Sequence, residues 1–289
     1  MFIYFCKKLT HMKKFVLPFA ILSFCFLSSI SQQVRTPAPS PPQTIKQDFG
    51  LSSIELSYSR PGIKGRNIFG YLVPYGKVWR TGANSATTLT FGDDVTIGGT
   101  KVPAGKYGLL TIPGEQEWTI IITKQLDVTN PSAYKQDQDV VRVTSKVNNL
   151  PFPLESFTMI FANLTSSSCD LQLIWDRTVV SFPIKTDIDT KVMSQIDNAM
   201  NKDNKPYFAS AMYYLDNGKD LNKALEWFNK ATDADPSAYF IFYQKARCLA
   251  KLGKKQDAIA VAQKSIQLSK DAKNEDYVAL NEKLIASLK

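Results

Sequence analysis

Histidine is almost absent from this chain of 289 residues, and the single one, His11, lies in the lysine-rich N-terminal segment. Once that segment is removed, no imidazole remains for a Ser–His–Asp or Cys–His nucleophile, or for a zinc site built on imidazole. Hydrolysis by a carboxylate pair, a Ser–Lys arrangement and calcium held by oxygen ligands stay compatible with the composition. No motif for any of these stands out, so we predict no catalytic residue, no cofactor and no metal.

Cysteine and net charge are also low. Only four cysteines occur, and the two beyond residue 31, Cys169 and Cys248, fall in segments of different predicted structure, which favours two buried thiols over a disulfide. The formal net charge is +9, and it becomes +5 without the first 31 residues, which contain four lysines and no acidic residue. A nucleic-acid-binding protein usually has a more one-sided basic balance, so no nucleic-acid partner is expected.

The first 31 residues have the pattern of a secretory signal peptide. Four lysines precede an uncharged apolar run at 15–30, and Ser29 and Ser31 are small residues suited to cleavage before residue 32. The run is short for a permanent membrane helix. We therefore expect an exported protein, periplasmic, at the cell surface or extracellular, with no stable membrane span after signal cleavage. A retained N-terminal anchor and a lipid anchor at Cys25 are the alternatives.

Hydrophobic patterning divides the rest of the chain. Residues 32–44 are rich in proline and are expected to form an extended linker. Residues 45–186 contain about ten short alternating segments separated by turns, which predicts an antiparallel β-sandwich or jelly-roll-like domain. Among the expected strands are 118–123, 170–176 with Trp175, and a separate strand at 178–184. From residue 187 the period becomes helical, which predicts a second domain at 187–289. The expected fold class is thus multidomain, β then α.

The helical part contains an internal repeat of ~34 residues, the period of tetratricopeptide repeats. Small residues such as Ala224 and Ala231 recur one period later as Ala258 and Ser265, where paired helices approach closely. This predicts tetratricopeptide-like helical hairpins at 205–238 and 239–272. A first helix at 188–201 and a capping helix at 274–288 are expected to complete the stack, since two repeats alone are marginal.

The segment from Ser59 to Pro113 is dense in glycine, proline, aromatic and basic residues. No acidic residue occurs between Leu56 and Gly92, whereas five cations do. They are Arg60, Lys64, Arg66, Lys77 and Arg80. We call the acid-free stretch at residues 57–91 the basic block. The whole segment, Ser59 to Pro113, resembles the signature of a bacterial exported family known as domain of unknown function 2911. The resemblance implies a β domain and export, and no reaction. The positions that match are Arg60, Lys64, Gly65, Arg66, Trp79, Arg80 and Asn84.

Two interpretations of the basic block stay open. Turn residues and uncompensated charge beside aromatic rings suit a polar or anionic ligand, such as a glycan or another anionic envelope component. The candidate ligand-binding residues are then Arg60, Lys64, Arg66, Trp79, Arg80 and Asn84. In the structural interpretation, Trp79 fills the core and the arginines pair with acids distant in sequence, such as Asp93, Asp94 or Asp176.

In tetratricopeptide geometry the first helix of each unit lines a concave groove. That placement makes Tyr213, Tyr243, Arg247 and Lys251 candidate partner-binding residues. Two cations on successive turns beside an aromatic ring suit an acidic or C-terminal peptide segment. The alternative is a solvated helix face that contacts no partner.

Together these patterns predict an exported envelope protein that binds or scaffolds, with a protein or peptide partner on its helical module. The alternative function is a histidine-independent hydrolase of carbohydrate or cell-wall material. Such an enzyme needs two carboxylates facing each other across a cleft, ~5–10 Å apart. The acid pairs in the sequence, at 93–94 and 115/117, stand at turn ends, where solvated side chains are expected.

Overall fold

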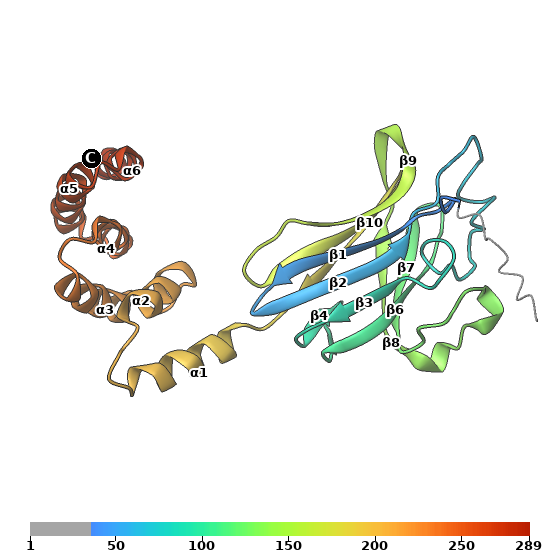
Figure 1. Ribbon diagram of the computed structural model, residues 1–289, viewed down its shortest axis with the longest axis horizontal. Helices are drawn as coiled ribbons and strands as arrows, with labels where there is room; N and C mark the ends of the chain where they lie inside the picture. The colour runs from blue at the N-terminus through green and yellow to red at the C-terminus, as the bar shows by residue number, and fades with distance from the viewer. Residues whose placement is uncertain (1–35) are drawn as a thin grey trace, which may run out of the picture. The chain divides into compact units, whose positions relative to one another are not determined.

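The computed structural model describes residues 36–289 (Figure 1). The expected signal peptide at 1–31, and the start of the expected linker, lie outside the described residues. Within 36–289, none of the helices has the length and apolar character that a membrane crossing requires.

The first part of the described chain is all β. The strands are β1 (Pro42–Phe49), β2 (Ser52–Ser59), β3 (Thr88–Phe91), β4 (Val95–Ile97), β5 (Thr100–Val102), β6 (Gly105–Ile112), β7 (Glu117–Thr123), β8 (Asp139–Lys146), β9 (Asn148–Ala162) and β10 (Ser168–Lys185). They form two antiparallel sheets, ordered β1-β2-β3-β6-β7-β8 and β5-β4-β10-β9. Two single-turn 3₁₀ helices, at Pro131–Ala133 and Gln136–Gln138, lie in the β7–β8 connection. The expected antiparallel β domain is confirmed.

Two strand expectations need correction. Strand β1 begins at Pro42, so the last residues of the expected linker at 32–44 belong to the sheet, with Ile45 opposite Leu56 on β2. Two separate strands were expected where the single long β10 occurs. Asp176 has a positive φ of 53° and the pairing register with β9 shifts on both sides of it. The strand therefore bends at a bulge without ending.

The core of the β domain lies between the sheets. Inward-facing residues of both sheets form one hydrophobic cluster, in which Leu56, Leu89, Leu171 and Val180 are fully buried. Alternation along the strands explains this, because every second side chain points to the same face. Cys169 is buried in this cluster, and the burial raises its pKa to about 11, so the thiol stays neutral at ordinary pH.

The second part is helical. Its helices are α1 (Asp189–Met200), α2 (Tyr207–Asp216), α3 (Leu221–Ala234), α4 (Tyr239–Lys251), α5 (Lys255–Asp271) and α6 (Glu275–Leu288). The repeat positions Ala224, Ala258 and Ser265 are fully buried, as helices that pack closely require. The predicted first helix, two helical hairpins and capping helix are all present. Cys248 is buried and, like Cys169, free, as expected.

Candidate functional site

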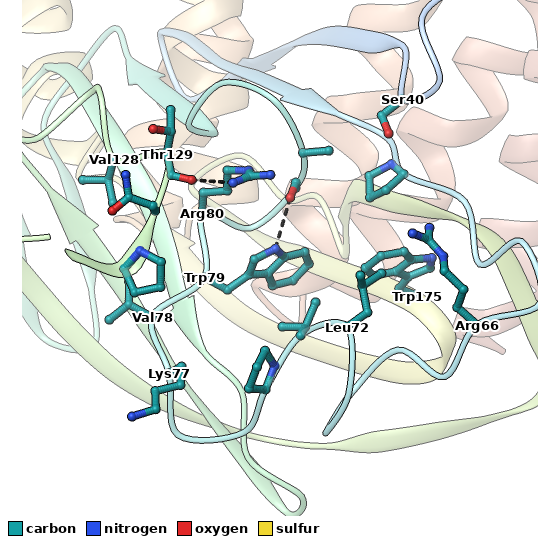
Figure 2. Close-up of a pocket in the computed structure, with 17 residues that line it drawn as sticks. Ser40, Arg66, Leu72, Lys77, Val78, Trp79, Arg80, Val128, Thr129 and Trp175 are labelled. Atoms are coloured by element: carbon teal, nitrogen blue, oxygen red, sulfur yellow. Dashed lines mark hydrogen bonds between the residues drawn. The ribbon is translucent and has the colours of Figure 1, made fainter. Parts of the chain in front are cut away.

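A pocket of about 400 Å³ opens beside the basic block (Figure 2). Three cations line it, together with two tryptophans and no carboxylate: Arg66, Lys77, Arg80, Trp79 and Trp175. Much of the remaining wall is apolar. It includes Leu72, Val73, Pro74, Val78, Val128 and Pro131. This is the size and character of a small-molecule site, an apolar cavity with a few polar groups.

Four segments far apart in the sequence build the pocket. The connection between β2 and β3 supplies its cations, the β7–β8 connection supplies the wall at 128–131, β10 supplies Trp175 and the chain before β1 supplies Ser40. Trp79 is fixed to the sheet by two backbone hydrogen bonds with Thr111 of β6. The Trp79 N–H donates to the Thr111 oxygen at 2.7 Å, and the reverse bond is 3.0 Å. The pocket wall is thus tied to the six-stranded sheet through β6.

The backbone after Trp79 is strained. Thr81 has φ +57°, which is rare for a β-branched residue, and it is completely buried. Its carbonyl accepts from the Thr87 hydroxyl at 2.6 Å, and the Gly82 carbonyl accepts from the indole N–H of Trp79 at 3.1 Å. A side chain at Gly82 (φ +153°) would place its Cβ 3.0 Å from the Ser59 oxygen. Strained turns that the surroundings hold in place cluster at functional sites.

Trp79 serves the core as well as the pocket. Its ring stacks on Trp175 with centroids 5.9 Å apart and contacts Phe157 and Trp118 at 5.1 and 6.1 Å. The half-buried indole therefore fits part of the structural interpretation, because it packs in the aromatic end of the core. The same indole lines the pocket, so a ligand would lie against a side chain that the core immobilises.

The two pocket arginines are held by backbone carbonyls. Arg66 donates from Nε to the Ile63 oxygen at 3.0 Å and from Nη2 to the Gly62 oxygen at 2.7 Å. Arg80 donates from Nη1 to the Thr129 oxygen, and its Nε is buried without a hydrogen-bond partner. Carbonyl oxygens fix a guanidinium in place without neutralising its charge.

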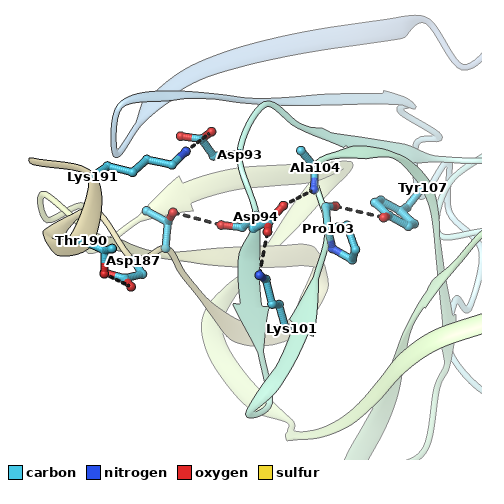
Figure 3. A network of polar contacts seen from close by, with 10 residues as sticks. Asp93, Asp94, Lys101, Pro103, Ala104, Tyr107, Asp187, Thr190 and Lys191 are labelled. Carbon is cyan, nitrogen blue, oxygen red and sulfur yellow. Dashed lines mark hydrogen bonds and ion pairs between the residues drawn. The ribbon is translucent and has the colours of Figure 1, made fainter. Parts of the chain in front are cut away.

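The expected pairing of these arginines with distant acids is wrong. Within residues 36–289, none of the five cations of the basic block forms an ion pair with a carboxylate. Asp93 pairs instead with Lys191 at 2.6 Å, and Asp94 pairs with Lys101 at 2.9 Å (Figure 3). The hydrogen bond from Lys101 lowers the pKa of Asp94 below its ordinary value. These two carboxylates therefore each face a lysine.

The other candidate ligand residues lie outside this pocket. Arg60 and Lys64 line a separate depression of about 240 Å³, where Arg60 donates to the Phe157 oxygen at 3.1 Å and to Thr158 Oγ1 at 2.7 Å. Asn84, at φ +58°, donates from Nδ2 to the Ser40 oxygen at 3.1 Å. Asn84 thus contacts a residue of the pocket wall without lining the pocket itself.

Sequence reasoning missed several pocket residues. Lys77 belonged to the basic block without any feature that set it apart. Trp175 read as a strand residue, and Ser40 and Thr129 carried no local signal. Only the packing of segments that are distant in sequence brings these side chains together.

The candidate partner residues of the helical module already have partners within the chain. Arg247 lies 3.3 Å from Asp216, and Lys251 Nζ donates to the Leu215 oxygen at 2.9 Å, which caps the end of α2. Tyr213 donates to Asp189 at 2.9 Å; burial and this carboxylate raise the pKa of Tyr213 to about 12. Tyr243 packs edge-on against Tyr277 of α6, with centroids 5.6 Å apart. The structure brings Arg247 and Lys251 to the α2–α4 contact, while the tyrosines face α1 and α6.

Comparison with protein families divides the chain in the same way. A family model described as "Protein of unknown function (DUF2911)" matches residues 40–184, which include all the pocket residues. A second model, described as "Anaphase-promoting complex, cyclosome, subunit 3", matches residues 191–265, within the helical part of the chain. No curated protein and no solved structure matches the chain.

Proposed function

Because the chain belongs to the family described as "Protein of unknown function (DUF2911)", whose description names no reaction, we propose a function from the pocket itself. The protein is a binding protein. Its β domain holds an anionic ligand in the pocket around Trp79, and its helical module contacts a protein partner. It is exported, and the ligand is a component of the cell envelope.

The observation that carries the proposal is uncompensated positive charge in a preformed pocket. Arg66, Lys77 and Arg80 line it, no carboxylate does, and the two guanidinium groups are fixed by carbonyls. An anion entering the pocket therefore finds donors already in position, so little side-chain freedom is lost on binding. Charge-assisted hydrogen bonds from guanidinium to carboxylate or phosphate are among the stronger polar contacts.

Partner binding by the helical module is supported by its repeat architecture. Stacked helical hairpins form extended surfaces that proteins of this kind use for recognition. A partner carboxylate that binds Arg247 would have to displace Asp216, and one that binds Lys251 would have to displace the Leu215 carbonyl. Binding at this surface therefore competes with contacts inside the chain. A hydrolase that uses a carboxylate pair would have to work elsewhere on the molecule, because no carboxylate lines this pocket.

Titration of tryptophan fluorescence tests the ligand part of the proposal, since Trp79 and Trp175 both line the pocket. The probes are an acidic oligosaccharide, inorganic phosphate and a neutral oligosaccharide of equal length, added to the chain without residues 1–31. We expect binding of anionic probes that weakens in Arg66→Met and Arg80→Met.

Arg177→Met is the matched control, because Arg177 also donates to backbone carbonyls, those of Leu150 and Pro151, but lies outside the pocket. Equal affinity in all three variants and the unchanged chain would refute an anion site at this pocket.

A further inference from the structure

The two pocket arginines lie on opposite sides of the Trp79 ring. In Figure 2, Arg80 lies beside Thr129 on one side of Trp79, and Arg66 lies beside Trp175 on the other. They come from different turns of the β2–β3 connection, which are held by separate carbonyls: Gly62 and Ile63 for Arg66, and Thr129 for Arg80. The pocket therefore offers two fixed positive centres.

Each guanidinium keeps donors for a ligand. An arginine has five N–H donors in a planar fork. Arg66 uses Nε and Nη2 for the chain, so its Nη1 makes no hydrogen bond within residues 36–289. Arg80 uses Nη1, which leaves Nη2 for a ligand, while its Nε is buried without a partner. Two anionic groups could thus each receive hydrogen bonds, one group from each guanidinium.

The surface between the two centres is largely apolar. Trp79 and Trp175 lie there with their rings stacked, flanked by Leu72, Pro74 and Val78. A charged group on this surface would lose its water without gaining a partner, which is costly. A ring with an uncharged face would instead cover the indole and remove apolar area from water. The middle of the ligand is therefore expected to be an uncharged ring.

We propose that the pocket selects a ligand with two anionic groups separated by an uncharged ring, and that Arg66 and Arg80 each bind one of these groups. The inference rests on the proposed function, since it specifies the anion that the same pocket takes. A pair of linked acidic sugars within a glycan and an aromatic dicarboxylate both carry two anionic groups on a ring framework, and both are included in the test.

The test compares dianions with matched monoanions by calorimetry on the chain without residues 1–31. One pair of probes is a disaccharide of two uronic acids and the same disaccharide with one carboxyl as its methyl ester. The other pair is benzene-1,4-dicarboxylate and benzoate. We expect one dianion or both to bind at least about 10-fold more tightly than the matched monoanion, because the second charge-assisted hydrogen bond is then made. Comparison of the sugar pair with the aromatic pair shows which of the two ligand classes the pocket accepts.

The variants locate the two contacts. Arg66→Met and Arg80→Met should each weaken dianion binding by about 10-fold or more and remove the preference over the monoanion. Arg177→Met should change neither. Arg66→Lys and Arg80→Lys keep the charge but lose the planar fork, so their preference should be intermediate. These lysine variants keep the test decisive if a methionine variant fails to fold.

Two results would overturn the inference, and they differ in what they say of the proposed function. Dianion and monoanion affinities that are equal, with one arginine alone affecting both, would refute two-centre recognition and leave an anion site standing. Absence of binding by every anionic probe, or binding that neither arginine affects, would refute both proposals together.

Discussion

The basic block of the β domain and the helical module hold positive charge in different ways. In the helical module, Lys223 and Lys230 both lie 2.9 Å from Glu226, and Lys219 lies 2.7 Å from Asp189. In the basic block of the β domain, Arg66 and Arg80 bind only neutral carbonyls. Paired charges leave little field outside, whereas unpaired charges in a concave wall attract anions. The contrast directs the search for a ligand to the β domain.

The largest expected effect comes from removing the aromatic support of the pocket. Trp175 is 2% exposed, packs on Trp79 and Phe157, and donates from its indole N–H to the Glu155 oxygen at 3.3 Å. Trp175→Ala should lower the free energy of unfolding by about 3–5 kcal/mol, because the cavity left is large. Denaturant unfolding measures this loss.

Phe152→Ala is the control for Trp175→Ala, because Phe152 is 59% exposed and its truncation should change stability by no more than about 0.5 kcal/mol. A loss below about 1 kcal/mol for Trp175→Ala would show that the pocket wall and the core are separate. The pocket would then not depend on the core for its shape, and it would differ from the helical surface only in its charge.

A smaller effect on stability is expected from Arg80→Met. The change removes the hydrogen bond to the Thr129 oxygen but leaves no carboxylate unpaired, so the loss should be about 1 kcal/mol. Thermal and denaturant melts measure it on the protein used for the binding assays. A loss of more than about 3 kcal/mol would mean that the guanidinium is needed for folding. Weaker ligand binding by this variant would then reflect a damaged fold and not a lost ligand contact.

The sequence predicted strands and helices better than it predicted the pocket. Alternation at Trp118–Thr123 and the period around Ala224 are local signals, and both elements appear as predicted. Strand β1 was missed because Pro42 and its proline-rich neighbours conceal an edge strand that pairs only with β2. Of the candidate ligand residues, Arg66, Trp79 and Arg80 line the pocket. Trp175 could not be predicted, since its position there depends on how the two sheets pack.

The pH dependence of stability should differ in sign between two carboxylates, Asp139 and Asp189. Asp139, in the β domain, has a pKa raised above its ordinary value of 3.8, chiefly by burial. Its ionised form is disfavoured in the fold, so its contribution to stability falls as pH rises from about 3.8 through the raised pKa. Relative to the unchanged chain, Asp139→Asn should therefore have a more favourable free energy of unfolding at pH 7 than at pH 3. Unfolding of Asp139→Asn and of the unchanged chain, measured across this range, tests the sign.

Asp189, at the start of α1, should show the opposite sign. Hydrogen bonds from Lys219 and Tyr213 lower its pKa below 3.8. Its stabilising contribution is therefore present above the unfolded value and is lost as pH falls through the lowered pKa. Asp189→Asn should lose stability at pH 7 and converge on the unchanged chain in acid. Parallel pH curves for the Asp139 and Asp189 variants would contradict the contrast between a pKa set chiefly by burial and one set chiefly by hydrogen bonds.

The smallest effect is expected inside the helical module, where three helices end in the same way. After α2, α4 and α5, an N–H bonds back five residues, from Lys219 to Tyr214, from Lys254 to Leu249 and from Asn274 to Ser269. The residue before each donor has positive φ. It is glycine in the first two turns but Lys273, at φ +56°, in the third. Lys273→Gly should therefore raise the free energy of unfolding by about 0.5–1 kcal/mol, because a side chain makes this conformation costly.

The reciprocal change, Gly253→Lys, places a side chain in the same backbone conformation at φ +75°. Open space surrounds the position where its Cβ would lie, so the penalty should come from the backbone alone, with the opposite sign and a size of about 1 kcal/mol. Denaturant unfolding of both variants measures the pair. Equal and opposite shifts would mean that the turns after α4 and α5 place the same demand on the backbone, as expected for corresponding positions of a repeat. If Lys273→Gly instead destabilises the chain, the gain in unfolded-state entropy outweighs the relief of strain, and the third turn differs from the other two.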